Sequence, residues 1–359
     1  MIDRSFLYDA ARNLYGSISY NNNSGKAVLP LRYILELTYR CNLACPYCYI
    51  GEDRQKNELS TEEWFDIIDQ IPMYAFISLI GGEVLLRKDF LKIFEKASKQ
   101  TLGKVNIISN GTLITDEMID SFIKNKLLLL SISLDGYGEN HDINRNKQGI
   151  FDKIILNLEK FNSKRRRSKP MLDIKTIVLE NNMDDLPKLY KLSSKLRSDY
   201  FSIAFKRNNE IRQSSELRNE FGEEFYSATY PLEPYFNMEH FKEIYKELES
   251  LSKATKTKLR WAPKFKPTGD FTRIERFYKL KDESINKIYN PCIFPYSNMY
   301  INPEGDVYPC LSYKIGNVKG KKLLEVYNDS KFRCFRKNLK ASKLFTSCQL
   351  CCELLPKNL

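Results

Sequence analysis

The segment "ELTYRCNLACPYCYIGE", residues 36–52, places Cys41, Cys45 and Cys48 within eight positions. No fourth cysteine follows within this segment, although a structural zinc site takes four ligands. The preceding "YILELT" (33–38) is apolar enough for a strand that is buried on both faces of a parallel sheet. The sequence therefore predicts three thiols just past the carboxyl end of a strand, where the active sites of parallel α/β folds lie.

Further strand-like segments alternate with amphipathic helical segments along the first two thirds of the chain. The strand-like segments span 76–83, 104–111, 127–136, 171–179 and 200–207. The helical segments span 60–71, 116–126, 149–164 and 182–196, and Ser60 with Glu63 forms a capping-box pattern at the start of the first. This alternation predicts right-handed βαβ units around a parallel sheet. Six such units favour an α/β fold of the partial (β/α)6 barrel type over a flat doubly wound sheet.

The alternation stops near residue 208, which suggests the following organisation. The chain divides into an N-terminal extension (1–30), the partial barrel (31–207), a connector that faces the substrate (208–290) and a small cysteine-rich α+β domain (291–359). Within the connector we expect a helix at 238–254 and a basic, proline-bearing loop at 258–271. The last domain holds six of the nine cysteines.

Composition narrows the classes of function. The 359 residues include nine cysteines and two histidines, and the formal net charge is +12. Apolar runs are too short to span a membrane, and the N-terminus lacks the apolar stretch of a secretory signal. We therefore expect a cytoplasmic chain, in which clustered cysteines indicate metal or redox chemistry rather than disulfides. The positive charge suits an anionic partner or simple solubility, and since no nucleic-acid motif accompanies it, no nucleic-acid partner is expected.

Four further motifs stand at the ends of successive predicted strands or soon after them. They are "GGE" (81–83), "ISNG" (108–111), "SLDG" (133–136) and "HDINR" (141–145). Together with the Cys-x3-Cys-x2-Cys spacing and Tyr47 before its last cysteine, this order resembles the radical S-adenosylmethionine (SAM) family. The resemblance covers residues 36–207. It implies that three thiolates hold three irons of a [4Fe–4S] cluster, and that the fourth iron binds the amine and carboxylate of SAM.

The resemblance also implies roles for the strand-end residues. Gly81, Gly82 and Glu83 would contact the methionine amino group of SAM, and Arg145 would pair with its carboxylate. The residues expected around the ribose and methionyl parts are Ser109, Asn110, Ser133 and Asp135. Val84 and Asn146 stand where family members usually have proline and glycine, which leaves the local loop geometry open. A zinc site completed by a distant residue is the alternative for the three cysteines.

The second group of cysteines lies near the C-terminus. "CIFPYSNMYINPEGDVYPC" (292–310), with "PEGD" as a hairpin turn, resembles the start of the SPASM and twitch domains that carry auxiliary iron–sulfur clusters. "SCQLCCELL" (347–355) adds a CxxC pair. One auxiliary [4Fe–4S] cluster would then be bound by Cys292, Cys310, Cys348 and Cys351. Cys352 could replace Cys351, and a four-cysteine zinc knuckle stays open as an alternative.

Cys334 lies in an amphipathic helical segment, 323–339. Two interpretations remain open for it: a free buried thiol that packs in the core, or a hydrogen-atom donor that quenches a substrate radical.

The resemblance implies an enzyme that reductively cleaves SAM to a 5′-deoxyadenosyl radical, which abstracts hydrogen from a substrate carbon. A flavodoxin- or ferredoxin-type protein would supply the electron. A ribosomal peptide that is oxidised, crosslinked or epimerised is the first expectation. Only forty residues precede Cys41, too few for a full winged-helix leader-peptide-binding module. The alternatives are a dehydrogenase or epimerase of a sugar, aminoglycoside or nucleotide-linked molecule, and a non-catalytic iron–sulfur redox sensor.

Overall fold

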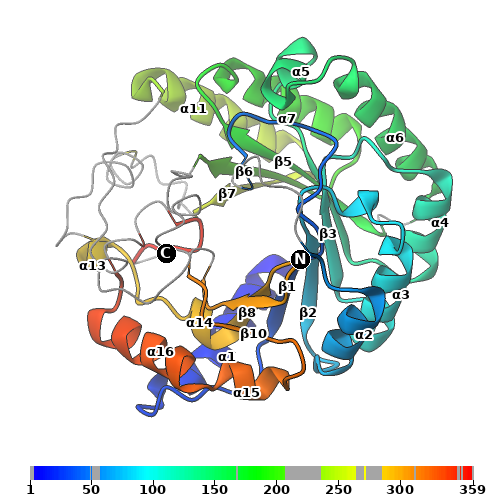
Figure 1. The fold of residues 1–359 in the computed structure, drawn as a ribbon. Coiled ribbons are helices and arrows are strands. Elements are labelled where there is room, and N and C mark those ends of the chain that lie inside the picture. The colour runs from blue at the N-terminus through cyan, green and yellow to red at the C-terminus, as the bar shows by residue number, and fades with distance from the viewer. Residues whose placement is uncertain are drawn as a thin grey trace.

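The structure is a computed structural model of the chain. It describes residues 4–48, 50, 57–166, 169–206, 236–263, 271, 285–310, 313–345, 348 and 351–357. Its strands lie side by side in one curved sheet, and most of its helices lie outside the curve (Figure 1).

Seven strands that are consecutive in the chain form most of the parallel part of the sheet. They are β1 (Arg32–Glu36), β2 (Phe76–Ile80), β3 (Val105–Ser109), β4 (Leu129–Ser133), β5 (Met171–Val178), β6 (Tyr200–Phe205) and β7 (Lys258–Ala262). Each pairs in parallel with the next. The α/β fold class, a partial barrel of parallel strands, is thereby confirmed.

Helices connect the successive strands of this series. The principal ones are α2 (Thr61–Asp69), α3 (Phe90–Gln100), α4 (Asp116–Lys124), α6 (Ile150–Lys164), α7 (Leu186–Lys195) and α11 (Met238–Ala254). The shorter ones are η1 (Val84–Leu86), α5 (Glu139–Arg145) and η2 (Met183–Asp185). Ser60 and Glu63 form the expected capping box at the start of α2. None of the described helices is long and apolar enough to cross a membrane.

The two faces of the sheet differ in chemistry. Side chains alternate along each strand, so one residue set faces the helices and the other faces the inside of the curve. The helix-facing set is mostly apolar and buried, as Leu35, Leu79 and Ile107 illustrate. The inward-facing set includes polar residues such as Ser78 and Asp173. The core therefore lies between the sheet and the helices, and the inner wall is free to carry function.

Strand β7 lies where we expected only a connector loop, at 258–271. Residues 258–262 instead pair in parallel with β6, and Ser202 lies opposite Arg260. The expected helix at 238–254 is confirmed as α11. The charged residues that suggested a loop are on the inner wall, where a strand can carry them because the opposite face packs on helices.

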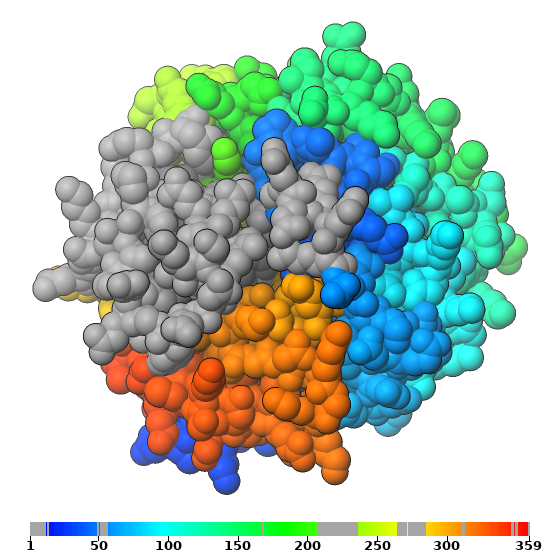
Figure 2. All heavy atoms as spheres, viewed as in Figure 1, coloured from blue at the N-terminus to red at the C-terminus, as the bar shows by residue number. Residues whose placement is uncertain are grey.

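The C-terminal part adds strands to the other edge of the same sheet. Its elements are α13 (Ile285–Ile288), α14 (Phe294–Ser297), β8 (Asn298–Ile301), β9 (Asp306–Tyr308), β10 (Gly316–Asn317), α15 (Leu323–Tyr327) and α16 (Ser330–Ser342). β8 pairs in parallel with β1, and β8 and β9 form the antiparallel hairpin expected around "PEGD". The N-terminal helix α1 (Arg4–Asn21) packs against α14. Figure 2 shows this orange and red segment packed against the blue and cyan part of the chain.

Candidate active site

The loop that carries Cys41, Cys45 and Cys48 is fixed to the end of β2. The amide of Gly82 donates to the carbonyl of Thr38 (2.8 Å), and the amide of Glu83 donates to the carbonyl of Arg40 (2.8 Å). A Cβ on Gly82 would lie 2.4 Å from the carbonyl oxygen of Arg40. Glycine is required here because the strand end packs against the backbone of the cysteine loop.

Glu83 is fully buried, and its carboxylate accepts three hydrogen bonds. Ser109 Oγ donates at 2.8 Å, the amide of Asn110 at 2.7 Å and the amide of Leu85 at 3.1 Å. Burial raises the pKa of Glu83, although these hydrogen bonds oppose the shift. The structure thus brings three predicted site residues together, and Glu83 holds the ends of β2 and β3 in register.

Arg145 is at the centre of a second cluster of predicted residues. Its Nη2 lies 2.5 Å from Asp135 Oδ2, and its Nη1 lies 3.7 Å from Cys45 Sγ. Tyr47 donates to the same carboxylate oxygen at 2.7 Å. Burial disfavours the charge of Arg145, but Asp135, Tyr47 and Cys45 outweigh it and raise its pKa. The guanidinium is therefore a permanent cation beside a cysteine of the loop.

Asp135 itself is held by residues that the sequence analysis missed. Its Oδ1 accepts from the amide of Ile177 (2.8 Å), and its amide donates to His141 Nδ1 (3.0 Å). Asn182 and Asn144 both donate to its carbonyl. Burial lowers the pKa of His141 to about 4, so the ring is neutral and can accept this hydrogen bond.

An amide chain reaches from the cysteine loop to the end of β3. Asn110 Nδ2 donates to Asn42 Oδ1 (2.9 Å), and Asn42 Nδ2 donates to Thr112 Oγ1 (2.9 Å). Asn42 follows the first cysteine directly, so its position in the motif could have indicated it. Thr112 gave no sequence signal, because its role depends on a contact with a residue 70 positions away.

The inner wall next to this site is polar. Asp173 is almost fully buried and accepts from Ser202 Oγ (2.7 Å) and Ser131 Oγ (3.3 Å). Lys175 Nζ lies 3.8 Å from Asp173, and 38% of its side chain is exposed. Burial raises the pKa of Asp173, although Lys175 and Arg260 oppose the shift. Ser133, the remaining predicted residue, is half-buried and lies opposite Lys175.

The residues fit the cofactors that the motifs imply. Three thiols from one loop can bind three irons of a cluster. Arg145 Nε is buried and has no hydrogen-bond partner among the described residues, so the guanidinium retains capacity for a ligand carboxylate. Cys41 and Cys48 are partly exposed on the same loop, as Cys45 is. Tyr47 and Asp135 contact the guanidinium of Arg145.

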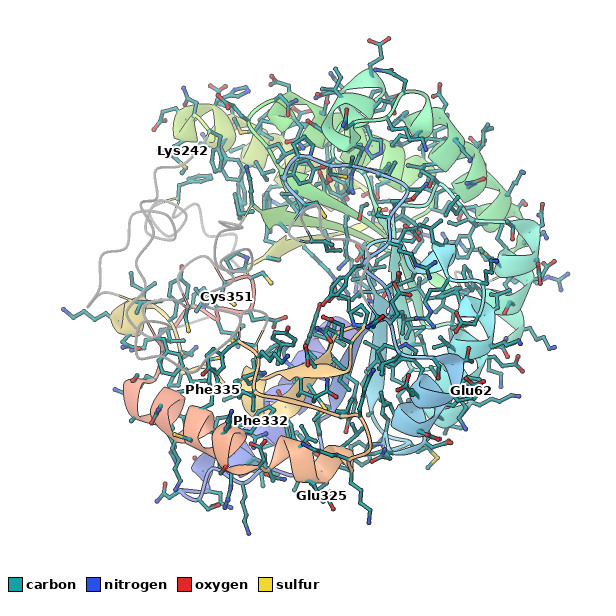
Figure 3. The ribbon with its side chains drawn as sticks, viewed as in Figure 1. Glu62, Lys242, Glu325, Phe332, Phe335 and Cys351 are labelled. Atoms are coloured by element: carbon teal, nitrogen blue, oxygen red, sulfur yellow. The ribbon has the colours of Figure 1, made fainter. Side chains whose placement is uncertain are left out.

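The four C-terminal cysteines predicted as ligands also lie near one another. Burial is the largest cause of the raised pKa of Cys348, and the neighbouring thiols of Cys292, Cys351 and Cys310 raise it further. Cys292 packs against Ile34, Phe294 and Tyr300 on the inner side of β1 and β8. Cys351 lies toward the middle of the ring of strands and helices (Figure 3).

Within the described ranges, no three histidine, cysteine, aspartate or glutamate side chains converge as ligands of a single metal ion. A cluster does not require such convergence, because each thiolate of an iron–sulfur cluster binds a different iron. Cys352 is partly exposed next to Cys351.

Cys334 is exposed, which contradicts the prediction of a buried thiol. Phe332, Phe335 and Leu339 define the buried face of α16, and the two phenylalanines are labelled in Figure 3. At about 100° per residue, Cys334 projects from the opposite face. That position gives no support to its second interpretation as a hydrogen-atom donor at the active site.

Two contacts join the cysteine loop to the β8–β9 hairpin. Asn302 Nδ2 donates to the hydroxyl of Tyr39 (2.8 Å) and lies 3.4 Å from the hydroxyl of Tyr308. The amide of Leu59 donates to the carbonyl of Pro303 (2.7 Å). The regions around the two groups of cysteines are therefore one packed unit.

Family models match both regions. The model described as the radical SAM superfamily matches residues 35–193, and the SPASM model, described as an iron-sulfur cluster-binding domain, matches residues 292–352. The matched ranges contain all seven cysteines predicted as ligands.

Solved structures share the fold over most of the chain. Streptococcus suis SuiB bound to S-adenosylmethionine has a TM-score of 0.64 and 16% identity, with 92% of this chain and 73% of that chain covered. SuiB bound to the precursor peptide SuiA has a TM-score of 0.65 and 16% identity, with 93% and 72% covered. Polyhistidine-tagged anSMEcpe with bound AdoMet has a TM-score of 0.58 and 19% identity, with 91% and 89% covered. Identities this low show the fold alone.

Proposed function

We propose that this chain, which belongs to the radical SAM superfamily and carries a C-terminal SPASM domain, modifies a ribosomal peptide by hydrogen abstraction. It is a radical SAM enzyme. Its radical SAM domain binds a [4Fe–4S] cluster and SAM, and its SPASM domain implies auxiliary iron–sulfur chemistry. When bound, the reduced cluster and SAM supply a 5′-deoxyadenosyl radical that abstracts hydrogen from an unactivated carbon. A single auxiliary cluster and a flavodoxin- or ferredoxin-type reductant are part of the proposal.

The observation that carries the peptide assignment is the shared fold with SuiB. That protein was solved with its precursor peptide SuiA bound, and the match extends over 93% of this chain. A peptide is thus the substrate class that the comparison favours.

The inner wall supports a substrate with an anionic group. Lys175 and Arg260 both face it, from β5 and β7, on either side of Ser202. The buried carboxylate of Asp173 offsets part of their charge. Because Lys175 remains partly exposed, it can pair with an acidic side chain or a terminal carboxylate.

In this proposal, residues of the chain bind the cluster and orient SAM. Cys41, Cys45 and Cys48 hold the cluster, and Arg145 pairs with the carboxylate of SAM through the edge that includes Nε. Asp135 and Tyr47 keep that guanidinium in place. The predicted contacts of Gly81, Gly82, Glu83, Ser109, Asn110 and Ser133 with SAM remain part of the proposal.

Anaerobic reconstitution with iron and sulfide, followed by dithionite and SAM, tests the chemistry. We expect 5′-deoxyadenosine by chromatography, and its absence would contradict the assignment. Synthetic peptides encoded beside the gene test the substrate class. Mass spectrometry should show a loss of about 2 Da, a crosslink or incorporation of solvent deuterium. Turnover of a sugar or nucleotide-linked molecule, with every peptide unmodified, would exclude the peptide proposal.

A further inference from the structure

Arg87 is a buried cation close to the cysteine loop, four residues after Glu83, and the family motifs gave it no role. Its exposed fraction is 7%. Five hydrogen bonds use its guanidinium, and they reach two carbonyls and two carboxylates. So many bonds to one buried side chain indicate a structural constraint on the groups that it contacts.

The two carbonyls flank the loop that carries Cys41, Cys45 and Cys48. Arg87 Nη1 donates to the carbonyl of Leu37 (2.8 Å), and Nη2 donates to the carbonyl of Leu59 (3.2 Å). Leu37 directly follows β1, and Leu59 directly precedes the cap of α2. A single planar group therefore holds together the two ends of the segment that contains all three cysteines.

Carboxylates around Arg87 strengthen the closure. Asp89 accepts from Nε (2.9 Å) and Nη2 (2.7 Å), and it also accepts from Thr61 Oγ1 in α2 (2.6 Å). Glu58 lies 3.4 Å from Nη1 and accepts from the hydroxyl of Thr38 on the opposite end of the loop. Both ends are thus tied twice, once through carbonyls and once through side chains.

We propose that Arg87 is a positioning residue for the radical SAM cluster, because it closes the base of the three-cysteine loop. The inference rests on the proposed role of Cys41, Cys45 and Cys48 as ligands. If the two ends of the loop are held together, its three thiolates keep the separation that the cluster needs. If the ends can move apart, the distances between the thiolates can increase.

The chain contains a matched control in Arg165. This arginine is also buried, donates to the carbonyls of Pro170 and Arg197, and pairs with Asp199. It lies near the amino ends of β5 and β6, whereas the cysteines follow the carboxyl end of β1. Loss of either arginine removes a comparable set of hydrogen bonds, but only Arg87 contacts the cysteine loop.

The test compares Arg87→Gln with Arg165→Gln in the full chain, anaerobically reconstituted and reduced. The readout is the part of the EPR signal that changes when SAM is added, followed during incubation with an iron chelator. We expect Arg87→Gln to lose this signal about 10-fold faster than Arg165→Gln. The signal that does not respond to SAM serves as an internal reference and should decay equally in both.

Equal decay of the SAM-responsive signal in the two variants would overturn the inference. If Arg87→Gln does not fold, Arg87→Lys against Arg165→Lys makes the same comparison, because lysine keeps the charge but lacks the planar fork that donates from separate nitrogens. A SAM-responsive signal that survives Cys45→Ala in the otherwise wild-type chain would instead contradict the proposed function.

Discussion

The two groups of cysteines are built in opposite ways. Cys41, Cys45 and Cys48 come from one loop, and the permanent cation of Arg145 lies beside Cys45. The C-terminal four come from separate segments: Cys292 precedes α14, Cys310 follows β9, and the other two follow α16. Burial raises the pKa of Cys292, and Cys351, Cys310 and Glu353 nearby raise it further.

This difference indicates different roles for the two sites. Beside the first group, a charged and hydrogen-bonded wall leaves capacity for a ligand with its own carboxylate. In the second group, burial raises the pKa of Cys292 and Cys348, and a metal cluster would compensate the charge of the thiolates that bind it. The first site is suited to bind and turn over a small molecule, and the second is suited to hold a closed cluster.

Removal of one ligand from each site should separate these roles most strongly. We expect Cys45→Ala to abolish SAM-dependent 5′-deoxyadenosine formation, because the cluster that reduces SAM loses an iron ligand. The double variant Cys348→Ala/Cys351→Ala should still cleave SAM. Iron should fall from about eight to about four per chain in both variants.

Chromatography of 5′-deoxyadenosine and iron analysis check these expectations. A double variant that cannot cleave SAM, although it is folded and retains its first cluster, would show that the auxiliary site does more than hold a closed cluster. Normal product formation by the same variant would show that the auxiliary cluster is dispensable.

Replacement of Arg336 should have the next largest effect, and it concerns the packing of the C-terminal region on itself and on the N-terminal segment. Its side chain is fully buried in α16 and donates to the carbonyls of Gly25 (3.1 Å), Pro295 (2.9 Å) and Tyr327 (2.8 Å). Arg336→Met leaves these carbonyls unsatisfied, so we expect the free energy of unfolding to fall by about 3 kcal/mol.

Denaturant titration measures this loss. Lys337→Met is the control, because Lys337 is exposed on the same helix and should change stability by about 0.5 kcal/mol or less. Equal losses in the two variants would mean that Arg336 does not hold α16 to α14 and α15.

Much of the site was predictable because its signals are local. The cysteine spacing and the short motifs at strand ends lie within a few residues of one another, and the structure brings Tyr47, Asp135 and Arg145 together. Periodicity also determined the helix faces. A count along α16 from Phe332 and Phe335 would have placed Cys334 outside the core, and the buried interpretation overlooked it.

The rest depended on contacts between residues far apart in the sequence. β8 pairs with β1, although more than half of the chain lies between them in the sequence, and no local sequence pattern predicts that pairing. β7 was missed because its inward-facing Lys258 and Arg260 give it the composition of a loop. Arg87 was missed for a similar reason, since its role depends on two carbonyls that lie 50 and 28 positions away.

Acid should weaken the first site through His141. Burial lowers its pKa from 6.5 to about 4. Between these two values the ring is protonated in the unfolded chain but stays neutral in the folded chain. Stability contributed by the neutral ring is present above pH 6.5 and is lost as the pH falls toward 4. Between about pH 7.5 and about pH 5.5 we expect a loss of about 1 kcal/mol.

The measurement is the free energy of unfolding at both pH values for wild type and His141→Gln, whose difference isolates this one group. His240→Gln is the control, because His240 is the other histidine and its side chain is only partly buried. An identical pH dependence in wild type and His141→Gln would mean that folding does not lower the pKa of His141.

The smallest effect tests whether the two sites act as one unit. Asn302 of the hairpin donates to Tyr39, which lies two residues before Cys41, and it approaches Tyr308, which lies two residues before Cys310. If this amide couples the regions, the cost of Tyr39→Phe should depend on whether Asn302 is present. A double-mutant cycle with Asn302→Ala should give an interaction energy of about 1 kcal/mol in the unfolding free energy.

Asn302 also accepts hydrogen bonds from the amides of Glu304 and Asp306, so Asn302→Ala alone will cost more than the bridge. The cycle removes that contribution, because the turn is lost equally with tyrosine or phenylalanine at position 39. Tyr39→Phe paired with Asn317→Ala is the matched control, since Asn317 holds the same turn through the carbonyl of Glu304. A coupling as large in the control cycle would mean that the turn, and not the amide between the tyrosines, transmits the effect. Coupling confined to Asn302 would establish a direct link between the loop of three cysteines and the hairpin that leads to Cys310.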